Sequence, residues 1–149
     1  MLNDENFINI AYEVASWSKC VSRKVWAVIV KDNRILSIWY NWTPSWYVNC
    51  NEYWKWKYTS KHHDWSYKYE IHAEMNALVW AARNWIAIDW ATVYCTYEPC
   101  FDCTRAMLAA WIKRIVFKEK YKHHIWEELK NFINACGCEI EQIKNKDNL

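Results

Sequence analysis

The sequence predicts an α/β protein, a three-layer α/β/α sandwich with a central mixed five-stranded sheet. Stretches with helical spacing of apolar residues alternate with short runs rich in β-branched residues, in the order αββαβαβαβ. The first two strand-like runs are joined by a short polar segment, which is typical of a hairpin. We find no internal repeat or linker, so residues 1–149 are predicted to form a single domain.

The N-terminal half is predicted to contain one helix and one hairpin. Residues 5–18 place apolar side chains at helical spacing, which indicates an amphipathic helix. Residues 25–30 and 35–40 are β-rich runs, and residues 31–34 form the turn between them. Residues 41–69 are polar, aromatic and aperiodic, and they predict a long loop. A loop of that length is usually functional or held by a metal.

The C-terminal half alternates helices with strands. The predicted elements are a helix over 72–83, a strand over 91–96, a helix over 100–110, a strand over 114–117, a helix over 127–135 and a strand over 139–143.

Charge and hydropathy exclude several classes of protein. The net charge is only +2 and the basic residues are scattered, so no electrostatic footprint for duplex nucleic acid is present. The acidic N-terminus lacks the apolar run of a signal peptide, and no stretch approaches the roughly 18 apolar residues of a membrane span. Seven cysteines that include a C-x-x-C pair favour metal ligation in a reducing compartment, so a cytoplasmic location is expected.

Tryptophan and glycine occur in unusual numbers. The chain has 13 Trp and one Gly, whereas average usage predicts about 10 glycines. Trp42 and Trp46 lie in a segment that otherwise reads as a turn, and Trp85 follows a helix at a position typical of glycine. We hypothesise that a stop codon reassigned to glycine has been read as tryptophan at many of these positions. The alternative is a genuine or engineered Trp-rich protein.

The most specific feature is His72-Ala-Glu74 followed by Pro99-Cys100-Phe-Asp-Cys103. One imidazole and two thiolates are three zinc ligands, and a catalytic zinc keeps its fourth position for water. Glu74 is not needed as a ligand, so it is free to move protons as the catalytic acid/base. H-x-E followed by P-C-x-x-C is a signature of zinc-dependent nucleobase deaminases.

Local geometry explains the spacing of these residues. Cys100 and Cys103 share a face at the start of a helix, where the helix dipole favours thiolates. His72 and Glu74 converge only in the first turn of a helix. Alone, H-x-E would indicate a surface helix start, and C-x-x-C a structural zinc or a redox pair. Together, each opening a helix and separated by one strand, they favour deamination.

The chain resembles the cytidine-deaminase superfamily, and specifically the deoxycytidylate deaminases of bacteria and bacteriophages. The segments that carry the resemblance are Ser18-Lys-Cys20, Lys24-Val25-Trp26, Tyr40-Asn41-Trp42-Thr-Pro44-Ser-Trp46, Val48-Asn-Cys50, Ile71-His-Ala-Glu-Met-Asn-Ala77, Ala81-Ala-Arg83-Asn-Trp85, Pro99-Cys-x-x-Cys103 and Trp111-Ile-Lys-Arg-Ile-Val. The resemblance implies a cytidine-deaminase-like fold with zinc between two helix N-termini. It also implies conversion of dCMP and water to dUMP and ammonia, which supplies thymidylate synthesis.

The resemblance also implies substrate contacts, assembly and regulation. Asn41, Asn76 and Tyr121 occupy the positions of substrate-contacting residues. Family members are often hexameric and are regulated by dCTP and dTTP, so a homo-oligomer with these effectors is expected. Relatives have glycine where this chain has tryptophan at seven positions, namely Trp26, Trp39, Trp42, Trp46, Trp85, Trp90 and Trp111.

A second, structural zinc is implied by resemblance to the phage relatives. Its ligands correspond to Cys20, Cys50, His62 and Glu70. The residues support this, since Cys50 and His62 bracket part of a long aperiodic loop that a metal would fix. The alternative is that Cys20 is an ordinary buried cysteine and that His62 and His63 are solvated.

Three other functions would be compatible with the zinc motif. A tRNA adenosine deaminase would need a basic surface, which the near-neutral charge disfavours. A riboflavin-pathway deaminase usually carries a fused reductase domain, and a chain of 149 residues lacks room for one. The third is a zinc-stapled binding module without turnover, which would result if Trp42 and Trp46 crowded the turn beside Asn41 and blocked the pocket.

Overall fold

A five-stranded mixed sheet forms the centre of the protein, and the computed structural model describes residues 1–55, 59–121 and 126–144. The strand order is β2-β1-β3-β4-β5. β1 pairs antiparallel with β2 and β3, whereas β3, β4 and β5 run parallel. The elements are α1 Asp4–Ala15, β1 Trp26–Lys31, β2 Arg34–Tyr40, α2 Cys50–Tyr53, α3 His62–Tyr69, α4 Ala73–Arg83, β3 Thr92–Tyr97, α5 Phe101–Ala109, β4 Arg114–Glu119, α6 Trp126–Ala135 and β5 Glu139–Gln142.

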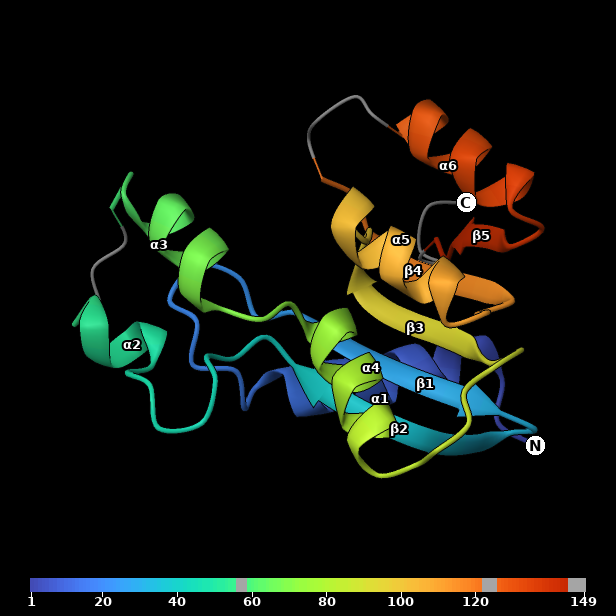
Figure 1. Ribbon diagram of the computed structural model, residues 1–149, viewed down its shortest axis with the longest axis horizontal. Helices are drawn as coiled ribbons and strands as arrows, with labels where there is room; N and C mark the ends of the chain where they lie inside the picture. Colours follow the sequence, from blue (N-terminus) through green and yellow to red (C-terminus); the bar gives the residue numbers. More distant parts are fainter. Residues whose placement is uncertain (56–58, 122–125, 145–149) are drawn as a thin grey trace.

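Helices cover both faces of the sheet. α1 packs on one face, and α4, α5 and α6 pack on the other, as Figure 1 shows. Successive residues of the buried strand β1 serve opposite faces: Ala27 and Ile29 contact the α4–α6 layer, whereas Val28 and Val30 contact α1. The predicted three-layer sandwich with a mixed five-stranded sheet is confirmed.

The segment over 41–69 differs from the predicted loop, because it contains the short helices α2 and α3. They lie apart from the sheet, at the left of Figure 1. Their buried residues Cys50 and Trp65 form a small cluster with Cys20, separate from the two cores of the sheet. Helices of four and eight residues are too short to display an amphipathic period, so the sequence pattern did not reveal them.

Four tryptophans adopt left-handed backbone conformations: Trp46, Trp85, Trp90 and Trp111 have φ angles of 68°, 58°, 62° and 59°. Glycine favours this region because it lacks a Cβ atom. The other three of the seven positions where relatives have glycine differ. Trp26, Trp39 and Trp42 are not among the residues with positive φ.

No helix in the described parts of the chain is long and apolar enough to cross a membrane.

Candidate metal centres and substrate cavity

The N-termini of α4 and α5 bring His72, Cys100 and Cys103 together. His72 is the N-cap residue of α4 and Cys100 that of α5, where its sulfur accepts a hydrogen bond from the Cys103 amide. His72 Nδ1 lies 3.5 Å from Cys100 Sγ and 3.5 Å from Cys103 Sγ. Tetrahedral zinc, with bonds of about 2.3 Å to sulfur and 2.0–2.1 Å to nitrogen, places such atoms about 3.5 Å apart. The three predicted ligands therefore fit a zinc ion.

The chemistry of the donor set supports the same conclusion. The hydrogen bond from Cys103, followed by that from His72, lowers the pKa of Cys100 to about 4 against the opposing effect of burial. A thiolate is thus available before any metal binds, and thiolate is the ligand form of cysteine. α5 begins at Phe101, so Pro99 lies just before the N-cap residue Cys100.

Glu74 lies beside this centre without being one of its ligands. It lies in the first turn of α4, and its side chain is buried, with 4% exposed. It is not one of the three residues, His72, Cys100 and Cys103, whose ligand atoms cluster together. Burial raises the pKa of Glu74 to about 7. A carboxyl group with a pKa near neutrality can both accept and donate a proton, as an acid/base catalyst must.

A cavity of about 470 Å³ opens onto the centre. His72, Glu74 and Cys100 line it together with Asn41 and Tyr121, two of the three predicted substrate contacts. This volume is within the usual range for small-molecule sites. Trp42 and Trp46 are not among the lining residues, and Trp46 is fully exposed, so the predicted blockage of the pocket by these indoles is not seen.

The amide side chains of Asn41 and Asn76 hold the backbone around the cavity. Asn41 Oδ1 accepts hydrogen bonds from Ser18 Oγ (2.7 Å) and from the Val25 amide (3.0 Å). Its Nδ2 donates to the Arg23 carbonyl at 3.0 Å. Asn76 Nδ2 donates to the Tyr40 carbonyl at 2.9 Å, and Asn76 does not line the cavity. A substrate role remains a prediction for both residues.

Arg23 is a cavity residue that the sequence analysis missed. Its guanidinium carbon lies 4.7 Å from the centre of the Tyr121 ring and 5.6 Å from that of Tyr97. The two rings stack with centroids 5.6 Å apart. Arg23 comes from an exposed loop, and no sequence motif links it to Tyr121.

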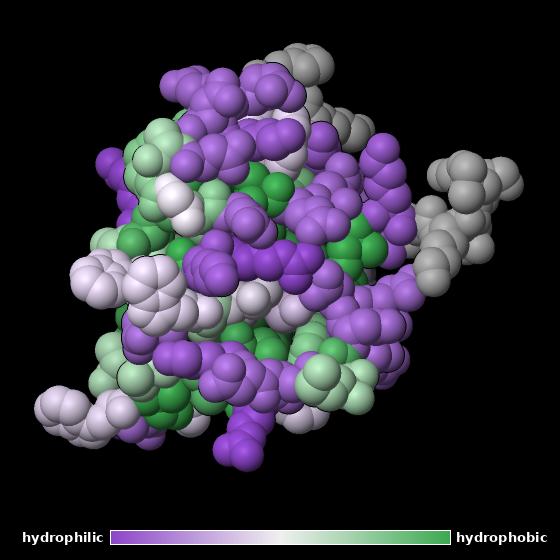
Figure 2. Space-filling view, turned by 90° about the vertical axis from the view of Figure 1, so that its right-hand side faces the viewer, coloured by the Kyte–Doolittle hydropathy of each residue, from purple (hydrophilic) through white to green (hydrophobic). Residues whose placement is uncertain are grey.

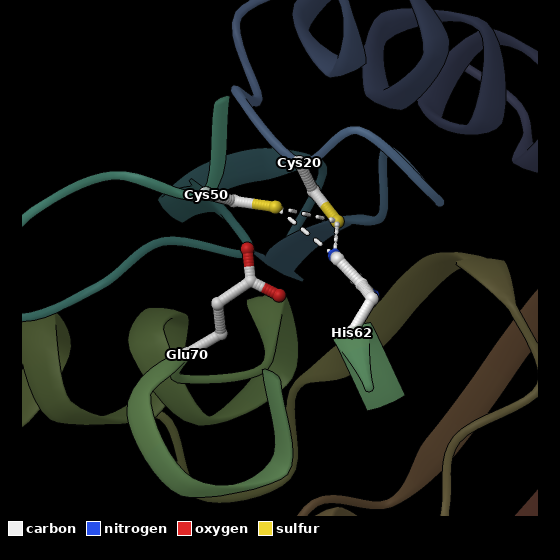
Figure 3. A group of neighbouring side chains, drawn as sticks. All are labelled: Cys20, Cys50, His62 and Glu70. Carbon is white, nitrogen blue, oxygen red and sulfur yellow. Dashed lines mark hydrogen bonds between the residues drawn. The ribbon is translucent and has the colours of Figure 1, made fainter. Parts of the chain in front are cut away.

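A second cluster joins Cys20, Cys50, His62 and Glu70, all of them buried (Figure 3). His62 Nε2 lies 3.6 Å from Cys20 Sγ and 3.0 Å from Cys50 Sγ, and the two sulfurs are 3.9 Å apart. Two sulfurs on tetrahedral zinc lie about 3.8 Å apart. Together with a Glu70 carboxylate oxygen, these atoms all lie within 4.8 Å of one another, which fits a four-ligand site.

Electrostatics in this cluster also favour a cation. The hydrogen bond from Cys50 lowers the pKa of Cys20 to about 5. Burial, reinforced by the charge on Cys20, raises the pKa of Glu70 to about 7. Negative groups that are forced together in a buried place are stabilised by a bound metal ion. Cys20, His62 and Glu70 also line the cavity, so the two clusters share one space.

Comparisons with known proteins agree with this geometry. The sequence model of the "Cytidine and deoxycytidylate deaminase zinc-binding region" matches residues 1–119. The chain is 40% identical to the deoxycytidylate deaminase of Enterobacteria phage T2, covering 89% of this chain and 88% of that protein. It is 34% identical to the deoxycytidylate deaminase of Enterobacteria phage T4, covering 94% and 89%.

A solved structure shows the same fold. The dCMP deaminase of cyanophage S-TIM5, crystallised with dCMP and dUMP, has a TM-score of 0.76, with 28% identity, and the match covers 93% of this chain and 95% of that one. Together with the metal centre at the paired helix N-termini, these similarities show that the chain belongs to the cytidine and deoxycytidylate deaminase family.

Proposed function

We propose that this protein catalyses the zinc-dependent hydrolytic deamination of dCMP to dUMP and ammonia. The observation that carries the proposal is the buried carboxyl group of Glu74 beside a three-ligand metal centre, in a cavity of about 470 Å³. The deaminases of phages T2 and T4 and of cyanophage S-TIM5 act on or bind this nucleotide according to their names. The resemblance implies that the dUMP produced is a precursor for thymidylate synthesis.

The chain provides the metal ligands and the proton carrier. His72, Cys100 and Cys103 would hold the zinc ion, which would supply a Lewis acid that lowers the pKa of a bound water molecule. Glu74 accepts a proton from water as the water oxygen bonds to C4 of the cytosine ring. The Glu74 carboxyl group then protonates N3. It next takes the remaining proton from the new C4 hydroxyl group and gives it to the amine, so that ammonia leaves and the C4 carbonyl of uracil forms.

We also propose a second, structural zinc at Cys20, Cys50, His62 and Glu70. Four buried ligands complete a tetrahedral site, which leaves no position for water, as in structural zinc centres. The site connects the loop at Cys20 to α2 and α3, so the ion would hold a segment that packs on neither face of the sheet.

Assembly, regulation and location are proposed from the resemblance and from the thiols. A hexameric homo-oligomer with dCTP and dTTP as effectors is expected, as in other members of the family. The ligand cysteines must stay reduced to bind zinc, which fits a reducing compartment such as the cytoplasm.

Ammonia release across a panel of dCMP, CMP, dCTP and tRNA tests the proposed reaction. The chain with all 13 tryptophans is compared with a version that carries glycine at the seven positions where relatives have glycine. We expect zinc-dependent ammonia release with dCMP as the preferred substrate, and greater activity in the glycine version. If the glycine version binds zinc but releases no ammonia from any of the mononucleotides, the proposed function is wrong. Release from tRNA alone would support the adenosine-deaminase alternative.

A further inference from the structure

Arg23 is the one lysine or arginine among the described residues that line the cavity. The same lining contains the carboxyl groups of Glu70 and Glu74, and the described part of the chain places no carboxylate within ion-pairing distance of Arg23. A monophosphate that enters this cavity meets two acidic groups and one permanently charged cation. The charge of Arg23 is thus available to a ligand.

The position of Arg23 is fixed at both ends of the residue. Its carbonyl accepts a hydrogen bond of 3.0 Å from Asn41, and its guanidinium lies over the stacked rings of Tyr97 and Tyr121. Stacking on aromatic rings orients the planar guanidinium, which can bind two phosphate oxygens at once. A guanidinium group that is already held in place loses less rotamer freedom on binding than a mobile side chain would.

We propose that Arg23 binds the 5′-phosphate of the substrate and so makes the enzyme selective for a nucleotide over a nucleoside. The assignment rests on the proposed function, because it assumes a cytosine nucleotide in the cavity. Phosphate at Arg23 orients the substrate with its base toward Glu74 and its phosphate toward the Tyr97–Tyr121 pair. Asn41 then has a positioning role, since it holds the backbone of Arg23.

Comparison of dCMP with deoxycytidine tests this role. For Arg23→Ala we expect the KM for dCMP to rise about tenfold or more with little change in kcat, and deoxycytidine to be unaffected. Arg23→Lys should recover part of the loss, because the charge remains but the planar guanidinium is gone. Lys24→Ala is the matched control, since Lys24 is an exposed neighbour that does not line the cavity.

Binding of dUMP and of deoxyuridine by calorimetry gives a readout that does not need turnover. We expect Arg23→Ala to weaken dUMP and to leave deoxyuridine unchanged. Equal losses for both ligands, or no loss for dUMP, would overturn the assignment. A loss of phosphate preference in His63→Ala instead would also overturn it, because His63 lines the same cavity. If dCMP is turned over normally by Arg23→Ala, the proposed function stands and only this inference fails.

A second inference comes from the backbone at the ends of three helices. α6 ends at Ala135 and is followed by Gly137, which has a φ of 73°. The Gly137 amide donates to the Asn134 carbonyl, and the Cys138 amide donates to the Ile133 carbonyl. This pattern is the Schellman motif, whose left-handed position is usually glycine.

Tryptophan occupies the same position at the other two helix ends. After α4, the amide of Trp85 donates to Ala82 and that of Ile86 to Ala81, at 3.2 and 2.9 Å. After α5, the amide of Trp111 donates to Leu108 and that of Ile112 to Met107, at 3.0 and 3.1 Å. The three helix ends are equivalent in backbone conformation, and only one of them carries glycine.

The two remaining left-handed tryptophans lie in tight turns. Trp46 is the third residue of a turn closed by Tyr47 N–H donating to the Pro44 carbonyl at 3.1 Å. Trp90 is the third residue of a turn closed by Ala91 N–H donating to the Ile88 carbonyl at 3.1 Å. A positive φ at the third position of a turn is a requirement that glycine meets best.

The indoles make few contacts in these places; the rings of Trp90 and Trp111 meet edge to face, with centroids 6.1 Å apart. Trp46 and Trp85 are 103% and 95% exposed, and Trp90 and Trp111 are 62% and 65% exposed. None of the four indole N–H groups donates a hydrogen bond to a described residue. Figure 2 views the end of the molecule where the α4–β3 and α5–β4 loops lie, and bulky pale side chains project from it into solvent.

We propose that glycine is the natural residue at positions 46, 85, 90 and 111. A codon that means glycine in the source, read as tryptophan, accounts for four left-handed tryptophans in a chain with one glycine. Three other residues also have positive φ, namely Asp32, Asn33 and Lys55. Aspartate and asparagine tolerate the conformation in a hairpin turn, and Lys55, with a φ of 43°, follows the C-cap residue of α2.

Thermal unfolding of single variants tests the proposal. Trp→Gly at each position should raise Tm by about 3 °C, and should exceed Trp→Ala at the same position, because alanine keeps the Cβ atom. Trp17→Gly is the matched control; Trp17 is 66% exposed but is not among the residues with positive φ, so glycine there should not raise Tm. Glycine variants no more stable than the alanine variants, or tryptophan masses at these positions in peptides of the natural protein, would overturn the proposal.

Discussion

The role of Glu74 depends on its distance along the chain from His72. The N-cap residue of α4 leaves the helix path, whereas Glu74 lies one residue inside the first turn, so both side chains reach the same space. Full burial then raises the pKa of Glu74 to about 7. The backbone thus places a carboxyl group near the metal centre without making it a ligand.

Glu74→Gln should retain zinc and lose most of the activity. Glutamine keeps the size of the side chain but neither gains nor loses a proton near neutral pH, so we expect kcat to fall by about a hundredfold to ten-thousandfold. Metal analysis and ammonia release measure the two effects. The control is Asp102→Asn, which removes an exposed carboxylate near the centre that pairs with Arg105. Residual activity close to that of the parent would refute proton transfer by Glu74.

Asp4 joins α1 to the sheet through a network of polar groups. Its carboxylate accepts hydrogen bonds from Arg114 at 2.9 and 2.7 Å and from the Tyr94 hydroxyl at 2.6 Å. The hydrogen bond from Arg114, followed by that from Tyr94, holds the pKa of Asp4 below its usual value although burial opposes it. The carboxylate therefore stabilises the folded state most when it is charged.

Asp4→Asn should lower the free energy of unfolding by about 1 kcal/mol at neutral pH, a modest value because the site is partly exposed. A depressed pKa means that this contribution is present above about pH 4 and is lost as pH falls through the lower pKa of the folded state. Denaturant unfolding of both proteins from pH 7 to 3 measures it. Their difference should shrink toward acid pH, while Glu13→Gln, on the exposed side of α1, should show no such trend. A difference that is constant with pH would contradict this account.

At the scale of elements, α2 and α3 depend on the second cluster more than on the sheet. Cys50 opens α2, His62 opens α3 and Glu70 follows the end of α3. The apolar contacts there are few, chiefly Cys20, Cys50 and Trp65. A metal ion that binds the start of α2 and both ends of α3 would supply the constraint that a core supplies elsewhere.

Cys50→Ser should therefore release one of two zinc ions and lower the free energy of unfolding by about 3 kcal/mol or more. Metal content and denaturant unfolding measure these effects, and the ion at His72 should stay. Cys136→Ser is the matched control, because Cys136 is exposed and belongs to neither cluster. Unchanged metal content in Cys50→Ser would show that the second cluster holds no ion.

At the scale of the whole molecule, the sequence predicted those features that depend on residues close together in the chain. Short β-rich runs between helical patterns predicted the sheet, and the two helix starts predicted the metal centre with Glu74. α2 and α3 were missed because they are too short for a period. Arg23 was missed because its contact with Tyr121 exists only once the loop before β1 meets the end of β4. Contacts of that kind arise from packing, and no spacing in one segment reports them.

The ligands of the two proposed ions differ in their exposure to solvent. This difference predicts which ion a chelator removes first. His72 is exposed to the cavity and Cys100 is partly exposed, whereas all four residues of the second cluster are buried. A chelator should therefore remove the ion at His72 first. During titration with a chelator, we expect activity to fall with the first equivalent of released zinc, and Tm to fall mainly with the second. In Cys50→Ser, activity and the one remaining equivalent should disappear together. Loss of stability before loss of activity in the parent protein would contradict this order and would place the catalytic ion in the less accessible site.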